Sequence, residues 1–256
     1  MVLCIKTFYD FIVNINFNQS NIKFKKGSVI LASAGPGAPN LITLKLKYIL
    51  GLADVVIFDA LVNKKILKFC RHDVKLIYAG KIKEKKSCTQ SEINEWLLEF
   101  SKKKKKVLRL KGGDVSFFSR VSQEINFLKK NKIRTTVFSG ITSSQASLKK
   151  AQSSFFNKSN FCNLITGHKI IKKKNKEVDY GQICKNKGKI VIYMGVGQIN
   201  LIISNLVANG INENEKVTIV ENVSFKSERL FFTTLKNCPM FIKRNDINSP
   251  SIIIIG

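Results

Sequence analysis

The residues of this 256-residue chain that could do chemistry stand where predicted strands end. Asp59 follows the apolar run "DVVIF", Lys81 follows "VKLIYAG", and a Gly112-Gly113-Asp114 turn follows "KVLRLK". In an open α/β sheet, the loops after the strands meet at one edge, where helix N-termini also present free N–H groups. Glycines in such loops let a ligand approach the backbone. These residues therefore predict a glycine-lined cleft for a nucleotide-like ligand, and they do not specify a reaction.

Further strand ends carry small or soft residues of the same kind. The "GPG" turn at 35–37 comes soon after "SVILA", "SGITSS" follows "TTVF", "TGH" follows "CNLI", and Met194 follows "IVIY". The "GPG" turn has no third glycine at the spacing of a dinucleotide-binding fingerprint. Two histidines are too few for most metal chemistry, and the scattered cysteines form no Cys-x-x-Cys pair. The sequence therefore predicts no metal site.

Each of these signals also has an ordinary structural explanation. Asp59 could cap a helix, Gly112-Gly113-Asp114 could be a simple turn, and Met194 could belong to a core. Lys81 is one lysine among many. The support for a binding site is the recurrence of such residues at successive strand ends.

The elements that must position these residues alternate along nearly the whole chain, as strand–helix units around a largely parallel sheet do. The candidate strands are "SVILA", "DVVIF", "VKLIYA", "KVLRL", "RTTVF", "NFCNLI", "GKIVIYM", "KVTIV" and "SPSIIIIG". The segment "FSGITSS", near the middle, predicts a hinge between two α/β units. We expect an N-terminal extension over 1–27, an N-terminal α/β domain over 28–138 and a C-terminal α/β domain over 139–256.

One helix can be predicted closely, over "TQSEINEWLLEFSKKKKK". Thr89 and Glu92 stand at capping-box spacing before a run of apolar residues at helical intervals. Those residues are Ile93, Trp96, Leu97 and Phe100. They predict a helix that faces a core, with the tryptophan in packing rather than in chemistry.

The composition excludes some classes of protein and leaves one question open. With 44 basic against 17 acidic residues the formal charge is +27, and the basic residues are almost all lysine. Such a charge suits a polyanionic partner, but an A+T-rich coding sequence would also enrich lysine, isoleucine and asparagine. No run reaches the roughly 18 apolar residues of a membrane span. The scattered cysteines favour a reducing compartment, so we expect a cytoplasmic protein.

Taken in order, the motifs "SAGPGAPN", "DALV", "YAGK", "TQSEIN", "RLKGGD", "SGITSS", "TGH", "VIYMG" and "VEN" resemble those of the tetrapyrrole methylase family. The resemblance extends from about Ser28 to the C-terminus. It implies two α/β domains with the active site in the cleft between them, and a homodimer. Within the family it is closest to the members that methylate uroporphyrinogen III at C-2 and C-7, which gives precorrin-2 through precorrin-1, with S-adenosylmethionine as methyl donor.

The resemblance also implies roles for particular residues. Asp59 would be the proton acceptor and Lys81 the proton donor. The positions that would contact S-adenosylmethionine are Pro36, Gly112, Gly113, Asp114, Phe117, Thr142, Ser143, Met194 and Val223. Because Val223 replaces a glycine of the family pattern, its contact would be through the backbone.

Several positions depart from the family pattern. Ala38 stands where the family has an aspartate, and Val115 and Ser119 replace a proline and a glycine, whereas Arg120 is kept. The segment "QSSFF" at 152–156 lacks the histidine and arginine of the family's "PLTHR", which would help to hold substrate carboxylates. Nearby lysines could substitute as point charges, namely Lys149, Lys150 and Lys158.

Two other functions stay open at this point. A methyltransferase of the same fold could act on a later precorrin, and a basic chain could be an RNA-binding relic without catalysis. The sequence lacks interleaved aromatic and basic patches, so we expect no nucleic-acid partner.

Overall fold

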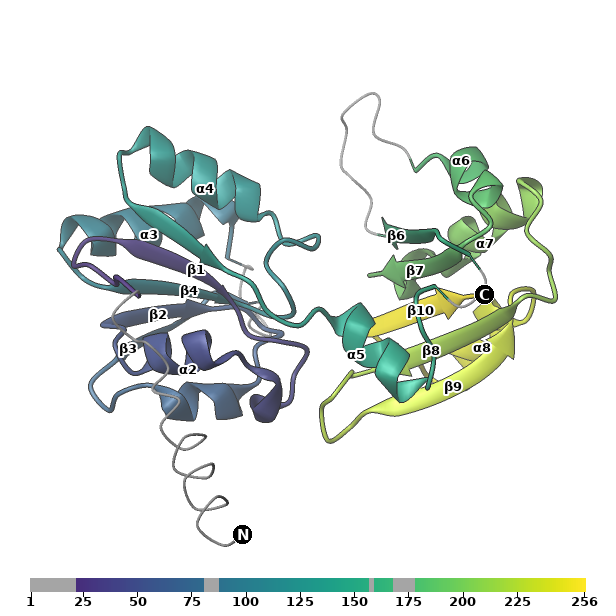
Figure 1. The fold of residues 1–256 in the computed structure, drawn as a ribbon, viewed down its shortest axis with the longest axis horizontal. Helices are drawn as coiled ribbons and strands as arrows, with labels where there is room; N and C mark the ends of the chain where they lie inside the picture. Colours follow the sequence, from purple (N-terminus) through teal and green to yellow (C-terminus); the bar gives the residue numbers. More distant parts are fainter. Residues whose placement is uncertain (1–21, 81–87, 157–158, 168–177) are drawn as a thin grey trace, which may run out of the picture.

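The computed structural model describes residues 22–80, 88–156, 159–167 and 178–256, and it places ten strands in two separate five-stranded sheets (Figure 1). The first sheet has the order β3-β2-β4-β1-β5, and all of its strand pairs are parallel. Its strands are β1 (Val29–Ser33), β2 (Val55–Phe58), β3 (Lys75–Tyr78), β4 (Val107–Lys111) and β5 (Thr135–Phe138).

Helices cover both faces of the first sheet, which explains why its central strands are continuous apolar runs rather than alternating ones. One face packs on α2 (Leu44–Leu50) and the 3-10 helix η3 (Lys64–Phe69), through Ile30 and Leu108 among others. The other face packs on α3 (Gln90–Lys102) and α4 (Val121–Lys130). A short 3-10 helix, η2 (Pro39–Leu41), follows the "GPG" turn.

The helix predicted from the capping-box spacing is α3. The Thr89 side chain accepts from the Glu92 N–H, and the Glu92 carboxylate accepts from the Thr89 N–H, so the capping box is confirmed. Ile93, Leu97 and Phe100 are buried. The predicted packing role of the tryptophan is also confirmed, because Trp96 lies partly buried against the same core.

The second sheet has the order β6-β7-β10-β8-β9. Its strands are β6 (Cys162–Thr166), β7 (Lys189–Tyr193), β8 (Lys216–Glu221), β9 (Arg229–Thr234) and β10 (Ser251–Ile255). One face packs on α6 (Tyr180–Lys185), α7 (Ile199–Ala208) and α8 (Cys238–Arg244), and a 3-10 helix η4 (Val196–Gln198) precedes α7. The other face packs on α5 (Ser143–Lys150), which Figure 1 shows beside β10.

The second sheet differs from the largely parallel arrangement expected from the sequence. Only β6 and β7 run parallel, whereas β10 is antiparallel to both of its neighbours and β8 is antiparallel to β9. The strand β9 is absent from the predicted set. It is an edge strand with a half-exposed "RLFFTT" pattern, which lacks the continuous apolar run of a central strand.

The connection between the sheets passes through 139–142, between β5 and α5 (Figure 1). The domain limits at 28, 138 and 139 stay a prediction. At the other end, Phe24 is buried in the core of the first sheet and Ile22 packs beside it. The last residues of the predicted extension 1–27 therefore belong to that core, and residues 1–21 lie outside the described part of the chain.

Candidate functional site

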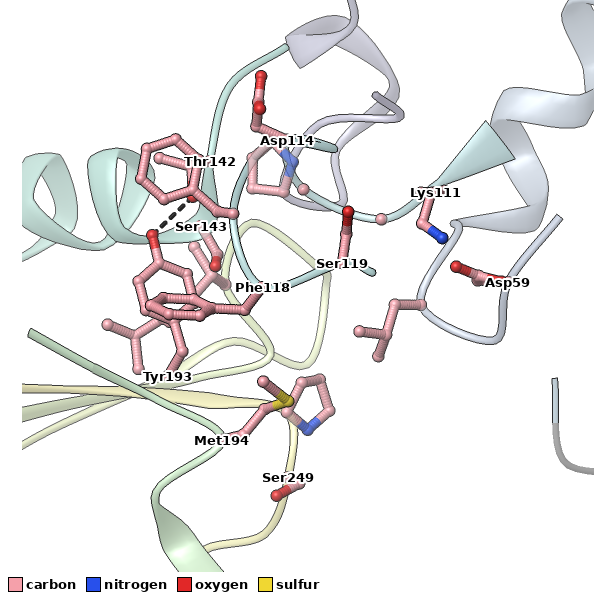
Figure 2. A pocket seen from close by; sticks show the side chains of 18 of the residues that line it. Asp59, Lys111, Asp114, Phe118, Ser119, Thr142, Ser143, Tyr193, Met194 and Ser249 are labelled. Carbon is pink, nitrogen blue, oxygen red and sulfur yellow. Dashed lines mark hydrogen bonds between the residues drawn. The ribbon is translucent and has the colours of Figure 1, made fainter. Parts of the chain in front are cut away.

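A cavity of about 430 Å³ lies between the two sheets, a size typical of small-molecule sites. It brings together ten of the predicted site residues: Pro36, Asp59, Gly112, Gly113, Asp114, Phe117, Thr142, Ser143, Met194 and Val223. Figure 2 shows the labelled members converging from both halves of the chain. Lys81 and His168 lie outside the described residues.

Two glycine turns that are distant in sequence form one wall of the cavity. The Gly35 N–H donates to the Gly113 carbonyl at 3.1 Å, and the Gly113 N–H donates to the Gly35 carbonyl at 2.8 Å. Both residues have positive φ, +72° at Gly35 and +69° at Gly113, which glycine adopts without a steric penalty. A Cβ at Gly113 would meet no atom within 4 Å, so its backbone faces open space where a ligand can approach.

The Asp114 carboxylate is occupied by the protein rather than free for a ligand. It accepts from the Gly140 N–H at 2.6 Å, from the Ser116 N–H at 2.7 Å and from the Ser116 and Ser33 hydroxyls. Burial alone would raise the pKa of Asp114, but these hydrogen bonds lower it below its ordinary value. Asp114 therefore ties the glycine turn to the end of β1 and to the connection between the sheets. The sequence suggested acceptance from a ligand, and in the structure the side chain shapes the loops.

Asp59 directly follows β2 and forms a salt bridge with a buried arginine. Arg109 Nη2 lies 2.5 Å from Asp59 Oδ1, and the arginine is 1% exposed. Arg109 Nε is also 3.3 Å from Glu124 Oε1, and Lys111 Nζ lies 2.8 Å from the same oxygen. Figure 2 shows the Lys111 ammonium and the Asp59 carboxylate facing each other across the cavity floor.

The surroundings of Lys111 disfavour its protonated form. Desolvation by burial and the neighbouring Arg109 charge lower its pKa, and the carboxylates of Glu124 and Asp59 oppose that shift only in part. The Lys111 side chain is 5% exposed, whereas Asp59 is 28% exposed. Asp59 is thus the member of this charged group that a ligand in the cavity can reach most easily.

The wall opposite the charges is aromatic and apolar. The Tyr193 hydroxyl hydrogen-bonds Thr142 Oγ1 at 2.7 Å, the dashed line in Figure 2, and Ser144 Oγ at 2.6 Å. These bonds tie the connection between the sheets to β7. The Phe118 ring packs 5.0 Å from the Tyr193 ring. Met194 is 45% exposed, so it is not a core residue, and its thioether points into the cavity (Figure 2). This wall suits a flat apolar group such as an adenine ring.

The loop after β8 closes the cavity over the "GPG" turn. The Ala38 N–H donates to the Ser224 hydroxyl at 2.9 Å. A Cβ at Gly37 would lie 2.4 Å from the Phe225 ring, so glycine is needed there for the close approach of the ring. Ala38, where the family pattern has an aspartate, contributes its backbone to this contact.

The divergent segment 152–156 does not line the cavity. Phe155 packs against the face of the second sheet that holds α5, and Phe156 is exposed. Lys150, one of the expected substitutes for the missing basic residues, pairs with Glu228 at 3.1 Å, and Lys158 lies outside the described residues. Arg120 does line the cavity, in the left-handed conformation before α4.

Sequence reasoning missed Arg109, Lys111 and Glu124 as site residues. The available signal was two cations inside the apolar strand "VLRLK", at the i and i+2 positions that share one face. Charged side chains are almost never fully buried unless they are paired. The strand thus required a partner, but nothing in the sequence identified it as Glu124 in α4.

Comparison with known proteins identifies the family of this chain. A family model described as tetrapyrrole (corrin/porphyrin) methylases matches residues 28–239. The chain is 37% identical over 240 residues to a uroporphyrinogen-III C-methyltransferase from Methanocaldococcus jannaschii, covering 90% of this chain and 96% of that protein. This chain belongs to the tetrapyrrole methylase family.

Two further relatives of the tetrapyrrole methylase show how far the likeness extends. The chain is 34% identical over 240 residues to a siroheme synthase from Nitrosomonas europaea; this covers 93% of the chain but spans about half, 50%, of that relative. A uroporphyrin-III C-methyl transferase from Thermus thermophilus, solved with S-adenyl homocysteine, superposes with a TM-score of 0.75 at 27% identity, covering 90% of this chain and 92% of that one.

The residues of this tetrapyrrole methylase fit S-adenosylmethionine. The open backbone at Gly113 can receive polar groups, and the Met194 and Tyr193 wall can receive an adenine ring. The part of the chain that the structure describes holds no cluster of three or more metal-ligating side chains. None of the helices in that part combines the length and apolar character needed to cross a membrane.

Proposed function

We propose that this tetrapyrrole methylase transfers methyl groups from S-adenosylmethionine to C-2 and C-7 of uroporphyrinogen III, giving precorrin-2 through precorrin-1. The observation that carries the proposal is the single cavity that gathers ten predicted site residues from both sheets, with the Asp59 carboxylate accessible on its floor. The 37% identity to the Methanocaldococcus jannaschii enzyme over nearly its whole length supports the same substrate.

The proposed chemistry needs positioning and one proton acceptor. When bound, S-adenosylmethionine supplies an electrophilic methyl group to an electron-rich ring carbon. Each methyl transfer leaves the ring with one proton to lose. Asp59, held by Arg109 at the cavity edge, is placed to accept that proton. Arg120 lines the same cavity and can pair with a substrate carboxylate.

The cavity walls would hold the reactants in register. The Gly112-Gly113 turn and the Tyr193-Met194 wall would bind the cofactor from opposite sides, because they lie on different sheets. The Ala38 to Ser224 hydrogen bond would keep the two halves closed during transfer. Confinement of this kind can supply a large part of the rate acceleration of a bimolecular reaction.

The decisive experiment is anaerobic turnover of uroporphyrinogen III with methyl-labelled S-adenosylmethionine. We expect a dimethylated tetrapyrrole and two molecules of S-adenosylhomocysteine for each ring, measured by mass spectrometry. Methylation of a later precorrin alone would replace the substrate while leaving the reaction class intact. Failure to bind S-adenosylmethionine in calorimetry, together with salt-sensitive RNA binding, would overturn the enzymatic proposal.

We further propose that the enzyme is a cytoplasmic homodimer, as the family resemblance implies. Light scattering coupled to gel filtration measures the mass in solution, against the 28.9 kDa of one chain. A mass of one chain at assay concentration would contradict the dimer without affecting the proposed reaction.

A further inference from the structure

At one side of the cavity lies a cluster of four charged side chains, of which the sequence predicts a role only for Asp59. It consists of Asp59 at the end of β2, Arg109 and Lys111 on β4, and Glu124 on α4. All three guanidinium nitrogens of Arg109 make contacts in this cluster, because Nη1 also donates to the Ile57 and Leu110 carbonyls, both at 3.3 Å. The arginine therefore cannot rotate away without losing several hydrogen bonds.

With Arg109 and Lys111 protonated and Glu124 ionised, the formal charges of this cluster balance when Asp59 carries a negative charge. Arg109 and Lys111 carry two positive charges, and Glu124 can compensate one of them. Glu124 is fully buried, and its Oε1 receives Lys111, Arg109 and the Gln90 amide at 3.2 Å. Its Oε2 has no hydrogen-bond partner among the described residues. Asp59 is therefore the carboxylate that can compensate the second positive charge of this cluster.

Stability alone gives no reason for such a cluster. A buried ion pair can often be replaced by apolar side chains of similar volume without loss, since its desolvation penalty offsets its attraction. Here Arg109 and Glu124 are not part of the cavity lining, and Lys111 reaches it with a side chain that is only 5% exposed, whereas Asp59 is 28% exposed. The arrangement is what a site needs in order to hold one carboxylate charged and oriented.

We propose that Arg109, Lys111 and Glu124 are positioning residues that set the ionisation and orientation of Asp59. This inference rests on the proposed function, in which Asp59 accepts the ring proton. The positive charges of Arg109 and Lys111 attract the Asp59 carboxylate, and the negative charge of Glu124 partly offsets that attraction. Two of these groups, Arg109 and Glu124, lie outside the cavity lining and would act on Asp59 without contact with the substrate.

The other groups around the cluster are few. From the start of α3, the Gln90 amide donates to Glu124. Cys88 lies close enough to feel the Arg109 charge, and Glu92 acts on Cys88 in turn; burial is the main reason that the pKa of this thiol is raised. Neither Cys88 nor Glu92 is bonded to Asp59 in the described structure, so they are background charges common to every variant below.

The test compares the pH dependence of methyl transfer in variants that act in opposite directions. Lys111→Met removes a positive charge beside Asp59, so activity should be lost at a higher pH on the acid side, by about one pH unit or more. Arg109→Lys keeps the positive charge and tests the orientation of Asp59 instead. Glu124→Gln keeps the acceptor oxygen but removes the negative charge, so activity should persist to a lower pH. A purely structural role would move none of these limits in a charge-dependent order.

Arg71→Lys is the matched control. Arg71 pairs with Asp54 at the other end of β2, at 3.1 Å, and both are outside the cavity. It should leave the rate, the KM and the acid limit unchanged. Arg109→Lys should lower kcat about tenfold or more with the KM for S-adenosylmethionine unchanged, because lysine cannot reproduce the planar fork.

A second readout keeps the inference separate from the proposed function. Carbon-13 NMR titration of the Asp59 carboxyl, assigned by its loss in Asp59→Asn, follows the same shifts without turnover. If the wild type methylates no tetrapyrrole, the proposed function fails while the titration still decides the inference. If the Asp59 titration is the same in Lys111→Met and Glu124→Gln as in the wild type, the inference is overturned. Should Arg109→Lys not fold, these two variants carry the test.

Discussion

The two halves of the molecule contribute different chemistry to the same cavity. The residues of the first sheet and its loops bring all the ionised lining groups that the structure describes: Asp59, Lys111, Asp114 and Arg120. The second sheet contributes aromatic, apolar and hydroxyl groups: Tyr193, Met194, Val223, Phe225, Ser249, Pro250, Ser251 and Ile252. In the proposed reaction the first half would therefore handle the proton, whereas the second half supplies no charged lining group among the described residues.

The difference follows from the way the strands run. In the parallel first sheet every carboxyl end lies at the same edge, so the loops after β1, β2 and β4 converge. In the second sheet, β10 is antiparallel to β7 and β8, so its amino end meets their carboxyl ends. That places the Ser249–Ile252 segment beside Tyr193 and Val223, and an apolar strand start becomes part of the wall.

The largest expected loss of activity comes from substitution of Asp59 in the first half. Asp59→Asn removes the accessible carboxylate and should lower kcat about 100-fold or more, because general-base catalysis typically contributes that much. S-adenosylmethionine binding, measured by calorimetry, should be unchanged. The counterpart from the other half, Met194→Leu, conserves volume and should change kcat less than about tenfold. Equal losses in both variants would contradict the division of roles.

An intermediate effect is expected at Asp114, which organises loops of the first half. Asp114→Asn replaces a charged acceptor of four hydrogen bonds and should lower the free energy of unfolding by about 1–3 kcal/mol at neutral pH, measured by urea denaturation.

The pH dependence at Asp114 has a definite sign. Because the pKa of Asp114 is lowered from 3.8 in the folded protein, its stabilisation is present above that ordinary value and is lost as the pH falls through the lower folded value. As the pH falls below about 4, the wild type should therefore lose more stability than Asp114→Asn. Ser116→Ala removes one donor and should fall between them. Parallel curves for all three proteins would show that Asp114 is not the source of this acid sensitivity.

The smallest effect is expected at Tyr193, where the second half contacts the connection between the sheets. Tyr193→Phe keeps the ring of the apolar wall and removes the hydroxyl that bonds Thr142 and Ser144. Each lost hydrogen bond costs about 1 kcal/mol, so thermal denaturation should show a modest drop in stability. Methyl transfer should stay close to the wild-type rate, because no charge is removed. A loss of rate as large as that of Asp59→Asn would assign chemistry to the second half as well.

Strong periodic signals in the sequence were sufficient for most elements of the fold. The nine predicted strands coincide with β1 to β8 and β10, and the capping box of α3 forms as expected. The half-exposed pattern of β9 was too weak, and the antiparallel insertion of β10 could not be seen, because strand direction in a sheet depends on long-range pairing. For the site, residues at strand ends were predictable, whereas the supports of Asp59 were not.

By itself the sequence determined which residues stand at the strand ends, since apolar runs, glycines and caps are local features. It also determined that Arg109 and Lys111 would need partners, because a charge inside an apolar strand cannot stay unpaired. Only the tertiary structure decided that the partners are Glu124 and Asp59, and that Asp114 turns toward Ser33 and Gly140. Those contacts join segments far apart in the chain, and their distances depend on how the helices and strands pack.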